Sequence, residues 1–186
     1  MTLDPKDAAA SLDDIAAIER RTREILNYGR VADILFLWGG LTLGGYLLNW
    51  FVPSSVVWAW PVISIGGFIA TVVIAWRRYP AMPRRAGVAW RWIGSYLSLL
   101  AFGVVVVYEL APLTVRQQQV FWPTLVMFSY VVGGFWVGRF FLYLGLTVIV
   151  LILIGYYLTG AWFALWLAFV YGGGLIAGGI WLRRSA

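Results

Sequence analysis

The chain has 186 residues, of which 62% are hydrophobic and only 12% are charged. Because about a quarter of the residues in soluble domains are charged, this composition is typical of a protein that crosses a membrane several times. Cysteine and histidine are absent, which excludes disulfides, thiolate or imidazole metal sites, cysteine nucleophiles and histidine bases. We therefore predict no cofactor. The formal net charge of +6 comes from arginines that flank apolar segments, which favours anionic lipid over nucleic acid.

Residues 1–30 are polar and charged, unlike the rest of the chain. Ser11 and Asp14 have the spacing of a helix-capping pair, and apolar residues recur every three or four positions up to Ile25, as in an amphipathic helix. The segment holds acids and no apolar core, so we expect no cleaved signal peptide. We predict a cytoplasmic tail with an amphipathic helix. Two interpretations stay open: the helix lies on lipid headgroups, or it docks a partner protein.

Six apolar segments follow, each near the length of about 20 residues that a membrane-spanning helix needs. Only Gly138 and Arg139 separate the fourth from the fifth, but one helix through both would be about 57 Å long, too long for one crossing. Asp33 lies in the predicted first turn of the first span, where it favours the positive end of the helix dipole. We predict an all-α membrane protein with six transmembrane helices in residues 31–186, at about 31–51, 56–76, 93–110, 120–137, 140–158 and 161–182.

The segment from Trp76 to Trp92, WRRYPAMPRRAGVAWRW, is rich in arginine and lies between the second and third spans. Basic residues accumulate on the cytoplasmic side of membrane proteins. With a cytoplasmic N-terminus, Lys6 and every arginine except Arg116 would lie inside. We predict a multi-pass protein of the bacterial inner membrane with both termini in the cytoplasm, in contact with anionic headgroups.

Short sequences recur along the apolar part of the chain. GYLL at 45–48 is similar to GYYL at 155–158, and GGFIA at 66–70 to GGLIA at 173–177. These similarities suggest three helical hairpin repeats. The alternative is that glycine-rich spans ending in Trp and Arg arise from the demands of the bilayer alone.

Three glycine pairs have the GxxxG spacing that lets helix backbones approach each other closely in a membrane. We expect these seams to pack within the monomer, with a homo-oligomer as the alternative. The pairs are Gly40 with Gly44, Gly134 with Gly138, and Gly174 with Gly178.

The predicted spans carry no charge near their centres, and Lys6 is the only lysine. This argues against ion-coupled pumps, proton relays and Schiff-base chemistry in the membrane. Because no serine has a histidine partner, we predict a protein that is not an enzyme, with no catalytic residue. One polar group stands out at the outer end of the third span: Tyr108, Glu109, Arg116 and Gln117. It forms either an exposed Glu109–Arg116 pair or an outer vestibule in which Glu109 attracts a cation or an amine.

Most of the 12 tryptophans lie at predicted span ends, as in the aromatic belt of membrane proteins. Aromatic residues deeper in the spans are better candidates for lining a cavity. They are Trp38, Tyr130, Trp166 and Tyr171.

Three stretches resemble small uncharacterised bacterial six-span integral membrane proteins: the charged helix LDDIAAIERRTREIL, the arginine-rich loop after the second span, and the closing sequence GGGLIAGGIWLRR. The resemblance extends over most of the chain and implies no particular activity or catalytic residue. Some members of that group are encoded beside winged-helix transcription regulators. The resemblance therefore implies a regulatory or partner-binding role.

We predict a non-enzymatic inner-membrane protein that presents a basic cytoplasmic face to a partner protein. The alternative is a small channel or facilitator for an uncharged or cationic solute, with Glu109 at its mouth. The predicted face for a partner or for lipid headgroups consists of arginines: Arg20, Arg21, Arg23, Arg77, Arg78, Arg84, Arg85 and Arg91.

Overall fold

The structure is a computed structural model that describes residues 5–78 and 86–185, with side chains for residues 28–78 and 94–185. Every regular element in these residues is helical. Three short elements, named η1 to η3, separate or interrupt the α-helices. The elements in chain order are α1 (Pro5–Phe51), η1 (Pro53–Ser55), α2 (Val56–Arg78), α3 (Ala86–Glu109), α4 (Val115–Val137), α5 (Arg139–Leu158), η2 (Gly160–Trp162), α6 (Phe163–Leu167), η3 (Ala168–Gly173) and α7 (Gly174–Arg184).

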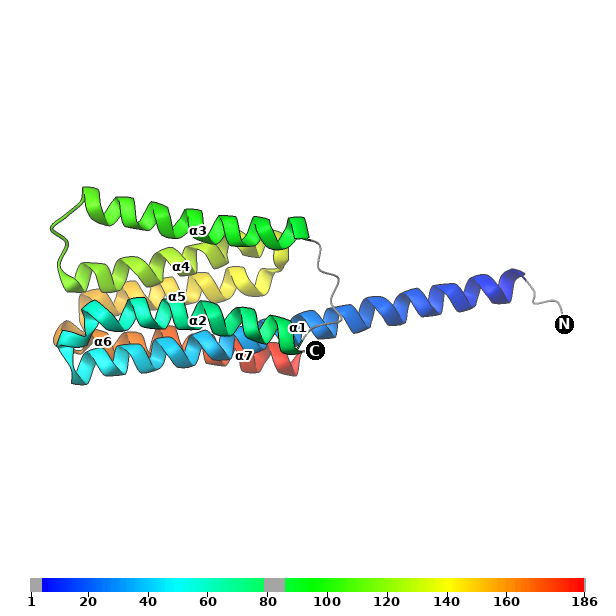
Figure 1. Ribbon diagram of the computed structural model, residues 1–186. Coiled ribbons are helices and arrows are strands. Elements are labelled where there is room, and N and C mark those ends of the chain that lie inside the picture. The colour runs from blue at the N-terminus through cyan, green and yellow to red at the C-terminus, as the bar shows by residue number, and fades with distance from the viewer. Residues whose placement is uncertain (1–4, 79–85, 186) are drawn as a thin grey trace.

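The long helices lie side by side in one bundle, and α1 projects from one end of it (Figure 1). Within the described residues, 5 helical segments are long and apolar enough to cross a membrane. The third predicted span lies in α3, whose apolar stretch Gly94–Glu109 is shorter than these. The all-α prediction is confirmed, and the apolar helices fit a multi-pass membrane protein. The five segments are Tyr28–Phe51, Pro53–Arg78, Val115–Val137, Arg139–Leu158 and Gly160–Arg184.

The bundle exposes large apolar side chains on its outside. Val57 is 83% exposed, and Trp136 and Tyr157 are each 80% exposed. Soluble monomers rarely expose extended apolar surface, whereas lipid tails cover such side chains without penalty. Inside the bundle, Leu35 and Met127 are 1% and 0% exposed and belong to one core cluster. The exposed surface therefore agrees with the composition in indicating a lipid environment.

The packing within the bundle falls into two groups of helices. Helix α1 packs against α2, α6, η3 and α7, while α4 packs along α5 and contacts α3. Helices α1 and α7 thus lie far apart in the sequence and side by side in space (Figure 1). The first and last apolar segments are held together by this contact.

The predicted surface helix and the predicted first span form a single helix, α1, of 47 residues. The placement of Asp33 in a first helical turn is therefore wrong, because α1 begins at Pro5. Polarity changes sharply near residue 28, but a change of polarity does not interrupt backbone hydrogen bonds. No helix-breaking proline lies between Lys6 and Phe51.

The boundary between the fourth and fifth spans lies where the sequence predicts it. Gly138 ends α4 with φ 152° and ψ 147°, and α5 begins at Arg139. This φ lies in a region that residues with a Cβ atom rarely adopt. One glycine therefore allows α4 and α5 to reverse direction and to pack closely against each other.

The last predicted span, 161–182, is interrupted rather than regular. It consists of part of η2, then α6, the π-helical segment η3 and α7. A Cβ atom at Gly172 would lie 2.6 Å from Cβ of Leu43, so only glycine allows η3 to approach α1 this closely. Such π-helical turns are rare and often occur at functional sites.

The GxxxG pairs differ in what they contact. Gly174 and Gly178 face side chains of α5, and Gly134 faces Leu142 of α5, as expected for packing within the monomer. By contrast, a Cβ atom added at Gly40 or Gly44 would meet nothing within 4 Å. The close approach of α1 to the C-terminal segment uses Gly39 and Gly172 instead.

Candidate functional site

A buried carboxylate lies near the end of the bundle from which α1 projects. Asp33 on α1 is 7% exposed and accepts hydrogen bonds from Arg78 of α2, at 2.7 Å, and from Arg183 of α7. The Arg183 guanidinium also lies 4.8 Å from the centre of the Phe36 ring. Hydrogen bonds between ionised groups are the strong ones. Asp33 therefore joins three helices where α1 leaves the bundle, and we name Asp33, Arg78 and Arg183 the Asp33 clasp.

The predicted basic face is described only in part. Arg77 is exposed at the end of α2, and Arg78 belongs to the Asp33 clasp. The remaining six predicted arginines have side chains outside the described residues: Arg20, Arg21, Arg23, Arg84, Arg85 and Arg91. Further basic side chains at the same end are Arg139 at the start of α5 and Arg184 at the end of α7, both exposed (Figure 1).

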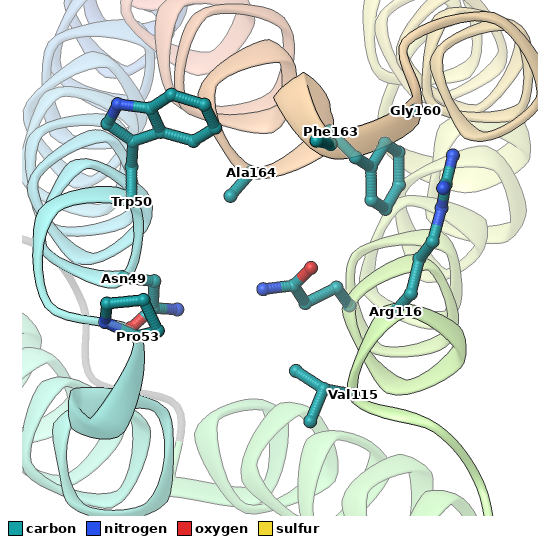
Figure 2. A pocket seen from close by; sticks show the side chains of 10 residues that line it. Asn49, Trp50, Pro53, Val115, Arg116, Gly160, Phe163 and Ala164 are labelled. Atoms are coloured by element: carbon teal, nitrogen blue, oxygen red, sulfur yellow. The ribbon is translucent and has the colours of Figure 1, made fainter.

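The opposite end of the bundle holds a pocket of about 370 Å³ between α1, α4 and α6. Figure 2 shows side chains from these separate elements facing one another across it. Apolar side chains form most of its wall, and three polar ones lie among them. The lining residues are Asn49, Trp50, Pro53, Val115, Arg116, Gln119, Gly160, Ala161, Phe163 and Ala164. We name this the end pocket.

Arg116 forms one wall of the end pocket, beside the ring of Phe163 (Figure 2). Its Nη2 donates to the carbonyl oxygen of Tyr156 at 2.5 Å. The guanidinium lies 5.2 Å and 5.4 Å from the ring centres of Tyr156 and Phe163, within the range of cation–π attraction. Its Nε is buried without a hydrogen-bond partner. Arg116 is thus held in place by α5 and α6, and its Nε donor is unused.

Asn49 faces the end pocket from the last turn of α1 (Figure 2). It is only 4% exposed. Its Oδ1 accepts a hydrogen bond from Oγ of Ser55 at 3.0 Å, while its Nδ2 is buried without a partner. Buried polar atoms without a partner are uncommon and disfavour the folded state. The end pocket therefore has an unused amide donor on the side facing Arg116.

Of the four residues of the predicted outer vestibule, only Arg116 lines the end pocket. Arg116 lines the end pocket, whereas Tyr108 and Glu109 end α3 as exposed residues that do not line it. Gln117 is exposed and forms a capping box with Thr114 at the start of α4. Among the residues with described side chains, Arg116 makes no ion pair with Glu109, and its Nη2 donates to the Tyr156 carbonyl.

The four deep aromatic residues proposed for a cavity pack inside the bundle. Trp38 donates from Nε1 to Oγ1 of Thr71 at 3.1 Å, and Trp166 donates to the carbonyl of Leu151 at 2.8 Å. Tyr171 is 6% exposed in the core cluster, and Tyr130 packs against this cluster. These residues fix contacts between helices and do not line the end pocket.

Sequence reasoning missed Asn49 and the Asp33 clasp. Asn49 is the one amide residue in the first apolar segment, and two serines follow it within six positions, which was a usable signal for a buried polar contact. In the described residues, no group of three or more acidic side chains is placed to hold a metal ion. No protein-family model, curated protein or solved structure matches this chain.

Proposed function

We propose that this chain is a non-enzymatic inner-membrane protein with six spans that presents α1 and the basic end of the bundle to a partner protein in the cytoplasm. The observation that carries the proposal is the continuity of α1 beyond the bundle (Figure 1). Residues 5–27 precede the apolar segment Tyr28–Phe51 and extend over about 35 Å at 1.5 Å per residue.

The continuity of α1 favours a protein partner over lipid headgroups for this segment. A helix that lies on the membrane surface must bend before it enters the bilayer, and α1 has no break between Pro5 and Phe51. An isolated helix in water gains little stability from its own hydrogen bonds. The projecting part of α1 has a stripe of apolar residues, which includes Ile15 and Ile18. A partner surface would cover this stripe.

The positions of the described basic residues support a topology with both termini in the cytoplasm. Arg77, Arg139 and Arg184 lie at helix ends on the side from which α1 projects, and Arg116 lies at the other end (Figure 1). This asymmetry follows the positive-inside rule. Helix α3, the third predicted span in chain order, would complete the six spans. It begins in the arginine-rich segment. The three hairpin repeats stay a prediction, as does a homo-oligomer through the open Gly40 and Gly44 face.

The alternative of a small channel or facilitator for an uncharged or cationic solute stays a prediction, and its cationic form gains less support. Glu109 does not line the end pocket, and the charged residue that does is Arg116. The positive charge of Arg116 in the lining of the end pocket would repel a cationic solute. We therefore keep the partner-binding role as the proposed function.

Co-purification tests the proposed function. The tagged chain is expressed at its native level, extracted into lipid nanodiscs and compared with a chain lacking residues 1–27 by mass spectrometry. We expect one stoichiometric protein with the full chain and its loss on truncation. Identical sets of proteins from both forms would overturn the proposal.

Two paired variants show which feature of the segment binds. Ile15→Ser with Ile18→Ser removes part of the apolar stripe and leaves the charge unchanged, whereas Arg20→Gln with Arg21→Gln removes charge and leaves the stripe. We expect the first pair to abolish capture and the second to weaken it. If only the arginine pair reduces capture, and vesicles of anionic lipid bind the segment as well as the captured protein does, the headgroup interpretation replaces the partner interpretation.

A further inference from the structure

We propose that the end pocket binds an anionic oxygen group, a carboxylate or a phosphate, carried on a small apolar body. The proposal concerns the end of the bundle opposite the projecting part of α1 and does not depend on the partner-binding role. It rests on the charge of the pocket, on its unused donors, and on its size and apolar wall.

The polar part of the end pocket is suited to an anion. Among the residues with described side chains, its one charged lining residue is Arg116, and none of its lining residues is an acid. Arg116 also lies in the first turn of α4, which begins at Val115, and the N-terminal end of a helix is its positive end. Neither positive feature is neutralised by an acidic side chain of the pocket lining. A carboxylate or phosphate would therefore meet favourable potential there, and an amine would not.

Two of the unused donors belong to residues of the pocket lining. Within the described side chains, three buried side-chain polar atoms lack a partner, and two of them belong to pocket residues, Nδ2 of Asn49 and Nε of Arg116. Oδ1 of Asn49 accepts a hydrogen bond from Ser55, and Nδ2 of Asn49 is on the side of the pocket (Figure 2). An oxyanion has enough lone pairs to accept from both donors. Ligand binding would satisfy atoms that the protein alone leaves unpaired.

The rest of the wall indicates the remainder of the ligand. Trp50, Val115 and Phe163 give the pocket a largely apolar lining, and Trp50 is held by stacking on Trp162 with ring centres 4.9 Å apart. A volume of about 370 Å³ falls in the lower part of the range for small-molecule sites. Benzoate has the required features, a carboxylate on a flat apolar ring, and it is a suitable probe.

The first measurement is saturation-transfer NMR of benzoate with the full chain in nanodiscs of zwitterionic lipid. Benzamide, which has nearly the same shape and no charge, is the matched control ligand. We expect saturable benzoate binding in the millimolar range and benzamide binding at least about tenfold weaker, because a hydrogen bond to a charged group contributes more than a neutral one. Equal binding of the two probes, or no saturable binding of benzoate, would overturn the proposal.

Variants then assign binding to the end pocket. Gln119→Glu adds a negative charge to its lining, and Gln117→Glu adds the same charge two residues away at an exposed position, where glutamate still completes the capping box with Thr114. We expect at least tenfold weaker benzoate binding for Gln119→Glu and a change of less than about twofold for Gln117→Glu. Arg116→Gln should weaken binding similarly, and it provides the answer if Gln119→Glu does not fold. Unchanged binding in both pocket variants would contradict the assignment.

The source of the anionic group is settled by changing the lipid. Adding phosphatidylglycerol to the nanodiscs supplies phosphate on a lipid headgroup. If it displaces benzoate from the full chain and from Gln117→Glu alike, the natural occupant is a lipid headgroup. If benzoate binding is unchanged, the pocket serves a water-soluble anion. Both results keep the anion site and differ only in where its ligand comes from.

Discussion

The neighbouring glycines Gly39 and Gly40 on α1 should respond in opposite ways to the same substitution. A Cβ atom at Gly39 would lie 2.7 Å from Cγ1 of Ile176 and 2.9 Å from the carbonyl oxygen of Gly172. The second atom belongs to the backbone, so Gly39→Ala must push α1 away from η3 and α7. Overpacking of this kind destabilises proteins by about 1–3 kcal/mol. At Gly40 no atom lies within 4 Å, so Gly40→Ala should be neutral or stabilise the helix by up to about 1 kcal/mol.

The assay is thermal unfolding of the purified variants in one detergent, followed by tryptophan fluorescence and by loss of monodisperse protein. The two substituted positions are neighbours in one helix. Effects of expression, detergent and refolding on the unfolding temperature should therefore be the same for both variants. We expect a lower unfolding temperature for Gly39→Ala and an unchanged or higher one for Gly40→Ala. Equal losses in both variants would refute the packing of α1 against the C-terminal segment. A loss confined to Gly40→Ala would instead indicate that the open face is covered by a second copy.

Four further variants can be tested by the same unfolding assay. Gly138→Ala should lower stability because φ is 152° there, whereas Gly133→Ala, with open space around it, should not; equal effects would contradict the turn. Thr114→Ala removes the cap of α4 and should destabilise by about 1 kcal/mol, and no change would contradict the capping box. Asp33→Asn should lower the free energy of unfolding by about 1–3 kcal/mol. This loss is smaller than for a fully buried pair because the side chains of Arg78 and Arg183 are 65% and 54% exposed. An unchanged unfolding temperature would show that the Asp33 clasp does not stabilise the protein.

Five of the six predicted spans coincide with helical segments of membrane length, and they were predictable because each depends on a local property of the sequence. Long apolar runs bounded by Pro, Gly or Arg identify helices of membrane length wherever they occur. The limit of about 30 Å on a crossing also forced a break near Gly138, and the glycine there supplies it. Length and polarity along the chain were sufficient for these features.

The start of α1 was harder to predict because polarity and helicity are separate properties. The sequence becomes apolar near Tyr28, and we predicted an amphipathic helix before this point and a separate first span after it. Backbone hydrogen bonds continue through such a change unless Pro, Gly or a competing cap intervenes. The single glycine near the change, Gly29, is tolerated within α1.

The Asp33 clasp and the end pocket depend on contacts between distant residues. Asp33 is 45 positions from Arg78 and 150 from Arg183, and Asn49 and Arg116 line opposite sides of the end pocket from α1 and α4. In the sequence, the acid nearest to Arg116 is Glu109. Because the sequence alone does not show how the helices are arranged, an ion pair between these two residues was the natural expectation. The fold places Arg116 against α5 and α6 instead.

The buried polar residues of the described core separate structural roles from binding roles. They are Asp33, Thr42, Asn49 and Ser55. Asp33 is paired with two arginines, Thr42 donates to the carbonyl of Trp38 at 2.7 Å, and Ser55 donates to Asn49. These three residues are satisfied within the protein, so their burial is explained by stability alone. Asn49 keeps an unpartnered donor, and that donor faces a pocket beside an arginine that also has one. The proposed anionic ligand would give both donors an acceptor, so the end pocket and not the Asp33 clasp is where we would test for a ligand.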